Sequence, residues 1–179
     1  SKTYVYARTE YADILDGIRH GRVFVTTGDL VSEVDVTVSG SRSRKNKAQI
    51  GGQLTLARGE DLIVEIRIRD PAGPNAAGRK PAVARVDVIV GELGGPVASR
   101  ADDRNPTAHV DRRFMAAKWK RKGEVLTMRH VIHRPRHDLY VRIRGTSTDE
   151  LEPLPDARAE DPWSDLWFYT NPTRVSLRR

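Results

Sequence analysis

Three histidines lie within eight residues of the sequence, in the segment HVIHRPRH at positions 130–137. Imidazole groups in this number are typical zinc ligands. His130 and His133 are three residues apart, however, so their side chains point to opposite faces of an extended strand. Pro135 then interrupts that strand. The spacing therefore does not favour a metal site. We expect the three histidines, His137 included, to lie in a strand end and in the turn that follows it.

A second group with chemical potential is a set of arginines at the polar positions of alternating segments: Arg67, Arg69, Arg85, Arg142 and Arg144. If neighbouring strands place them on one face, their guanidinium groups would bind phosphate or carboxylate bidentately. Glu65 and Asp87 fall on the same face, which favours cross-strand ion pairs instead. Arg67, Arg69, Arg142 and Arg144 are kept as candidate ligand-binding residues.

Aromatic residues gather near the end of the chain, in the segment DPWSDLWFYTNPTRV at positions 161–175. Exposed Trp163 and Trp167 would stack on sugar rings or on bases. Clusters of this kind more often close one end of a β-sandwich, and the Asn171–Pro172 turn is suited to lead into a last strand. Trp163 and Trp167 are therefore candidate ligand-binding residues. The alternative is that they close one end of the sandwich.

The basic segment SRSRKNK (Ser41–Lys47) would attract phosphate, although a charge run of this kind is usually a solvated loop. Nucleic-acid binding is not favoured, because no aromatic residues interleave with the basic runs. The sequence contains no H-x-H, H-E-x-x-H or G-x-S-x-G motif and no phosphate-binding glycine loop. The chain by itself is therefore not expected to be a catalyst.

Composition sets further bounds on the function. The 179 residues include 31 basic and 24 acidic side chains, which gives a net charge of +7 that permits acidic partners without requiring them. No cysteine is present, so disulfides and thiolate metal sites are excluded, and a cysteine-free chain fits any compartment. No run of about 18 apolar residues occurs, so no membrane-spanning segment is expected.

One amphipathic helix is predicted over Thr9–His20. Its apolar stripe consists of Tyr11, Ile14, Leu15 and Ile18, at the spacing of one helical face. Thr9 is a suitable N-cap, and Gly21 suits the left-handed position that follows a helix.

After this helix the apolar period changes to two. Seven to nine strands are expected, most with one apolar face, which is typical of antiparallel sheets with one buried side. Two such sheets hide their apolar faces against each other, so the predicted fold is an antiparallel β-sandwich preceded by one amphipathic helix. The expected segments are Arg22–Thr26, Val34–Val38, Leu62–Ile68, Ala84–Val90, Leu126–Ile132, Leu139–Ile143, Leu166–Tyr169 and Thr173–Leu177.

Two stretches resemble one family of enzymes. Lys2–Leu30 contains Thr3-Tyr4-Val5, the helical stripe, Gly21-Arg22, Phe24-Val25-Thr26 and Gly28. This order resembles the junction at the end of the barrel in PHP-type metallohydrolases (the polymerase and histidinol phosphatase superfamily), in particular their CehA/McbA-like branch. Trp167–Val175 resembles the closing W-x-x-N-P segment of that family. Asp29 and Thr173 depart from the family's usual proline and aliphatic residue.

The resemblance implies a division of the chain into residues 1–30, the strand and helix that end a PHP barrel, and residues 31–179, a C-terminal β-sandwich accessory domain. The family's metal-binding histidines and acidic residues precede the T-Y-V strand, so none maps onto this sequence. Ser1-Lys2-Thr3 is not a typical native start, and the sequence is expected to be a piece of a longer protein. The implied parent is a phosphoesterase-type hydrolase that uses zinc or manganese.

The implied role is non-catalytic: packing on the upstream PHP barrel of the same chain, bordering its active site, or forming a homo-oligomer. An alternative is a β-sandwich module that binds carbohydrate or an acidic ligand. Either way, the four apolar side chains of the helix should not stay in water, because burial of each is worth about 1.5–3 kcal/mol. We expect the stripe to fold back on the sandwich or to pair with a second copy of the chain.

Overall fold

The computed structural model describes residues 1–43, 45–71, 73–95, 99, 101, 104–153 and 161–178. Arg44, in the basic segment Ser41–Lys47, lies outside this range. The elements in chain order are β1 (Lys2–Val5), α1 (Tyr11–Arg19), β2 (Val23–Thr26), β3 (Glu33–Gly40), β4 (Lys47–Gln49), β5 (Gln53–Leu56), β6 (Leu62–Arg69), β7 (Arg85–Glu92), β8 (His109–Met115), the 3-10 turn η1 (Ala116–Lys118), β9 (Lys120–Lys122), β10 (Val125–Ile132), β11 (Leu139–Thr146), β12 (Trp167–Thr170) and β13 (Thr173–Leu177).

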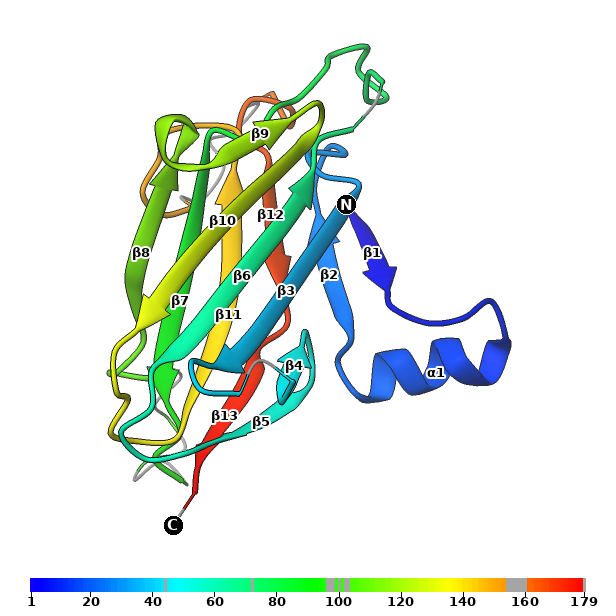
Figure 1. Ribbon diagram of the computed structural model, residues 1–179. Helices are drawn as coiled ribbons and strands as arrows, with labels where there is room; N and C mark the ends of the chain where they lie inside the picture. The colour runs from blue at the N-terminus through cyan, green and yellow to red at the C-terminus, as the bar shows by residue number, and fades with distance from the viewer. Residues whose placement is uncertain are drawn as a thin grey trace.

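The strands form two sheets that face each other, which confirms the predicted mostly-β, sandwich-like fold (Figure 1). One sheet has five strands in the order β4-β3-β6-β10-β9. The other has eight strands, with the path β1-β2-β12-β11-β13-β5 and with β7 and β8 continuing from β11. All pairings are antiparallel except that of β13 with β5.

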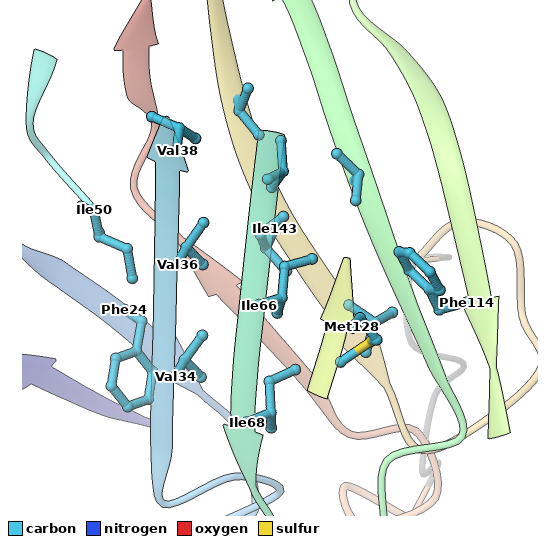
Figure 2. Packing of buried hydrophobic residues seen from close by; sticks show 14 of the residues in the cluster. Phe24, Val34, Val36, Val38, Ile50, Ile66, Ile68, Phe114, Met128 and Ile143 are labelled. Carbon is cyan, nitrogen blue, oxygen red and sulfur yellow. The ribbon is translucent and has the colours of Figure 1, made fainter. Parts of the chain in front are cut away.

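The core lies between these sheets and follows the alternation in the sequence. In the five-stranded sheet Val34 and Ile66 point inward, and Phe114 and Ile143 come from the opposite sheet into the same cluster (Figure 2). Val88 of the larger sheet belongs to this cluster as well. Polar residues occupy the alternate positions, because successive side chains of a strand point to opposite faces. The period-two pattern therefore determines which side of each sheet is buried.

The described residues contain thirteen strands, so the expectation of seven to nine was too low. The strands without an expected counterpart are β4, β5, β8 and β9. These strands are short or, like β8, lie at a sheet edge with one well-buried residue, Phe114. β4, β8 and β9 show little hydrophobic alternation, and β5, although Leu54 and Leu56 are buried, is only four residues long, so its pattern is too short to identify a strand.

The helix is shorter than predicted and begins differently. It spans Tyr11–Arg19, and Glu10 occupies the N-cap position without a side-chain hydrogen bond, so the prediction of Thr9 as N-cap was wrong. The C-terminal prediction is confirmed: Gly21 has a φ of +66°, and its N–H donates to the carbonyl oxygen of Ile18 at 3.0 Å.

The first thirty residues contribute to the larger sheet. β1 pairs with β2, and β2 pairs with β12 near the end of the chain. The segment between β2 and β3 then crosses to the five-stranded sheet. The division of the chain at residue 30 stays a prediction. α1 lies to one side of both sheets, joined to them through β1 and β2 (Figure 1).

Substitution of Ile66 by alanine should destabilise the protein by about 2–5 kcal/mol, because its side chain is 2% exposed between the sheets and truncation leaves a cavity. Ile18→Ala is the matched control, since Ile18 is 52% exposed, and it should change stability by less than about 0.5 kcal/mol. Urea unfolding measures both. Equal effects of the two substitutions would contradict the assigned core.

Candidate functional site

The histidines of the HVIHRPRH segment do not converge. Each lies beside a carboxylate from a different segment: His130 with Asp111 at 2.5 Å, His133 with Asp61 at 3.3 Å, and His137 with Glu92 at 2.8 Å. Among the described residues, no group of three or more histidine or acidic side chains is placed to hold a metal ion. The three imidazoles therefore serve separate contacts.

The candidate arginines are divided between the two sheets. Arg67 and Arg69 lie on β6 of the five-stranded sheet, whereas Arg85, Arg142 and Arg144 lie on β7 and β11 of the larger one. The sheets face each other through the core, so these side chains occupy two opposite outer faces. The single basic face considered from the sequence does not form.

On the five-stranded sheet, ion pairs engage both arginines. Arg67 contacts Glu33 at 2.9 Å and Asp35 at 3.1 Å, and Arg69 contacts Glu33 at 2.8 Å. The hydrogen bond from Arg67 lowers the pKa of Glu33. Arg67 also lines an open hollow of about 570 Å³, together with Lys118, Lys120 and Arg129. Cross-strand ion pairs are therefore present on this face, but their carboxylates are those of Glu33 and Asp35 and not that of Glu65, which the sequence suggested.

On the larger sheet, a buried charge network surrounds Asp87. The Asp87 carboxylate accepts hydrogen bonds from Nε of Arg85 at 3.1 Å and from Nη2 of Arg144 at 2.8 Å. The side chains of Arg85 and Asp87 are 1% exposed, and that of Arg144 is 6% exposed. Charges this deeply buried are tolerated when they are paired and hydrogen-bonded.

The segment that follows β11 covers this network. Arg85 donates to the carbonyl oxygens of Asp149 and Leu151, and Arg144 donates to that of Leu151. Arg144 also forms a bidentate pair with Glu152, at 2.6 and 3.1 Å. Burial would lower the pKa of Arg144, but its hydrogen bonds to Glu152 and Asp87 outweigh burial and raise it. This cover makes Arg85 and Arg144 internal residues.

Trp167 and Arg142 lie beside the same network. The Trp167 ring is buried, and the guanidinium groups of Arg85 and Arg144 lie over it at 5.9 and 5.5 Å from its centre. Arg142 donates to the carbonyl oxygen of Thr170 at 2.9 Å and lies over the Tyr169 ring. Trp163 is half-buried and packs against the core. The two tryptophans therefore do not form an exposed pair.

The apolar stripe of α1 is largely exposed. Tyr11 is 76% exposed, Ile18 52% and Ile14 36%, while Leu15 is half-buried. The expectation that the stripe folds back on the sandwich was wrong, because the short links through β1 and β2 hold the helix beside the sheets. Pairing with a second copy stays a prediction.

The side of the helix away from the stripe contacts β1 and the residue before β2. Gly17, the only buried residue of α1, lies against β1, where an added Cβ would be 2.7 Å from a methyl group of Val5. Asp16 forms an ion pair with Arg22 at 2.5 Å, and the N–H of Tyr6 donates to the carbonyl oxygen of Arg22 at 2.8 Å. These contacts lie on one side of the helix and leave the stripe uncovered.

An aromatic groove of about 300 Å³ lies between β1, β2 and the start of β3. The rings of Tyr4 and Phe24 stack there with centres 4.6 Å apart, and Tyr6 lies next to Phe24 at 5.9 Å. Burial raises the pKa of Tyr6. The groove and the stripe both belong to the β1–α1–β2 unit, which the sequence singled out by its helical period.

Comparison with known proteins found no matching family model, no matching curated protein and no matching solved structure. In the described part of the chain, α1 is far too short to cross a bilayer, and no other helix reaches the length and apolarity that a membrane span requires.

Substitution of Asp87 by alanine should destabilise the protein by about 3–5 kcal/mol, because it leaves the guanidinium groups of Arg85 and Arg144 buried without their shared carboxylate. Glu33→Ala is the control: it also removes a carboxylate between two arginines, but in an exposed setting, and should cost less than about 1 kcal/mol. Chemical denaturation compares them. Similar losses in the free energy of unfolding would show that the buried network contributes no more to stability than the exposed ion pairs.

Acid should weaken the cover over this network. The hydrogen bond from Arg144 lowers the pKa of Glu152 from its ordinary value of 4.5, so the charged form stabilises the folded state. That contribution is complete above pH 4.5 and is lost as the pH falls through the lowered folded-state pKa. The Tm difference between the wild type and Glu152→Gln should shrink over this range. Glu65→Gln, at a carboxylate without an ion pair to any described residue, should show no such trend.

Proposed function

We propose that this chain is a non-catalytic accessory domain of a PHP-like metal-dependent hydrolase, and that α1 docks it on the catalytic barrel. The observation that carries the proposal is the exposed apolar stripe of a helix that is fixed in place. Full burial of an aliphatic side chain is worth about 1.5–3 kcal/mol, and the partly exposed Ile14 and Ile18 forgo a fraction of it, as does Tyr11. A rigid apolar helix face of this kind is suited to packing against another domain.

The short length of α1 strengthens this argument. A nine-residue helix is marginal in water without tertiary contacts. Here the contacts of Gly17 and Asp16 hold it from one side, so the helix stays formed while its apolar side faces outward. Docking would therefore require little ordering of the helix, which lowers the entropic cost of association.

The order of elements is consistent with the resemblance. β1 contains Thr3-Tyr4-Val5, α1 carries the stripe, and β2 contains Phe24-Val25-Thr26. These are the positions that resemble the end of a PHP barrel and its exit into a β-rich domain. In the proposed assembly the aromatic groove of Tyr4 and Phe24, which lies between β1, β2 and the start of β3, is a second candidate contact surface.

In the proposed assembly the metal chemistry belongs to the barrel. A divalent ion such as zinc or manganese would there activate water for hydrolysis of a phosphoester-type bond. The described residues of this chain offer no cluster of ligands for such an ion. The proposed contribution of this chain is to stabilise the barrel and to border its active site.

The double substitution Ile14→Ser and Ile18→Ser, made in a full-length protein that includes the barrel, should lower the Tm of the barrel and its manganese-dependent hydrolysis of p-nitrophenyl phosphate. The physical reason is the loss of two apolar contacts across the proposed interface. Ala12→Ser with Arg19→Ser, on another side of α1, is the control and should leave both quantities unchanged.

Several outcomes would overturn the proposal. One is a start codon directly before the codon for Ser1, in place of upstream sequence with an H-x-H motif and further acidic and histidine ligands. Another is that the barrel has the same Tm and the same hydrolytic activity in the stripe variant as in the wild type. A third is a stable dimer of residues 1–179 that the stripe variant dissociates, because the stripe would then serve a second copy.

A further inference from the structure

A hollow of about 620 Å³ lies where three segments meet: the turn between β5 and β6, the link between β10 and β11, and the end of β13. Four basic side chains line it: Arg58, His133, Arg134 and Arg136. Three of them come from the HVIHRPRH segment, which the proposed docking role does not use. The hollow is distinct from the stripe of α1 and from the Asp87 network.

The three arginines of this hollow have no ion-pair partner among the described residues, although two carboxylates lie at its edge: Asp61, and Asp138, which accepts a hydrogen bond from the N–H of Leu177 at 2.7 Å. No carboxylate lines it, and Arg58, Arg134 and Arg136 are exposed without an ion pair to any described residue within 4.0 Å. The adjacent Asp61 contacts His133 at 3.3 Å instead. On the outer faces of the sheets, Arg67 and Arg144 are paired, whereas Arg129 has no ion pair to a described residue.

The backbone at this hollow is constrained. Arg134 has a φ of +43°, in the left-handed region that a long side chain rarely adopts. Its N–H donates to Oδ1 of Asp61 at 3.1 Å, and Pro135 fixes the next φ. Non-glycine residues in this region persist only where surrounding contacts hold them, and they are concentrated at ligand sites. The turn thus presents Arg134 and Arg136 from a defined backbone.

We propose that this arginine hollow binds a soluble phosphoanion with at least two negative charges, such as a pyrophosphate group. Guanidinium groups bind phosphate oxygens through two parallel hydrogen bonds, and three of them around one hollow match a multiply charged anion. A single-stranded nucleic acid would gain from stacking platforms, and no aromatic residue lines the hollow. This site is independent of the docking role proposed for α1.

Calorimetric titration with inorganic pyrophosphate tests the site directly. Wild-type protein should bind pyrophosphate, and the double substitution Arg134→Gln and Arg136→Gln should weaken binding by roughly tenfold or more, since two charge-assisted contacts are lost. Lys47→Gln with Arg129→Gln is the matched control: it removes the same net charge at exposed positions outside the hollow. Its affinity should stay within about twofold of the wild type.

A second variant keeps the proposal falsifiable if the double variant does not fold. Arg58→Gln lies in a different turn, and it should also weaken pyrophosphate binding while leaving the Tm unchanged. Equal weakening in the Lys47 and Arg129 control would overturn the proposal, because it would indicate attraction to overall charge. The proposal would also be overturned if the wild type did not bind pyrophosphate. This holds whether or not the wild type binds a single-stranded oligonucleotide.

Discussion

The contact between the apolar faces of the two sheets is the constraint on which the other features depend. Val34 and Ile66 from one sheet meet Val88 and Ile143 from the other, and this burial fixes one face of every long strand. Polar side chains are consequently confined to the outer faces. There they remain in water, as Arg67 does, or they require a cover, as Asp87 does.

The sequence predicted those strands in which apolar and polar residues alternate, because this alternation reflects the burial of one face of the sheet. Strands such as β3 and β6 are long enough to show their period, whereas β4 and β9 are held by backbone pairing that carries no such signature. The internal position of Arg144 was not predictable, because it depends on the segment around Leu151 folding over β11. The apolar stripe of α1 was recognisable, but its exposure depends on where β1 and β2 attach.

Three of the physical settings in which the protein places its positive charge differ in how that charge is compensated. Around Asp87 it is neutralised inside the protein, on β6 it is paired in contact with water, and at the HVIHRPRH turn it is left open. A net charge of +7 therefore says little about recognition by itself. The location of unpaired guanidinium groups is the more informative quantity, and it emerges only from the tertiary arrangement.

The pairing of β2 with β12 has a consequence for the order in which the protein folds. Thr27 accepts and donates hydrogen bonds with Trp167 across a separation of 140 residues. During synthesis, β2 therefore lacks this neighbour until nearly the whole chain has left the ribosome, and contacts of such long range form slowly. The β1–β2 pairing and the contact of Gly17 with Val5 are local in the sequence, so the arrangement of the helix on its two strands does not depend on β12, whereas the attachment of this unit to the large sheet does.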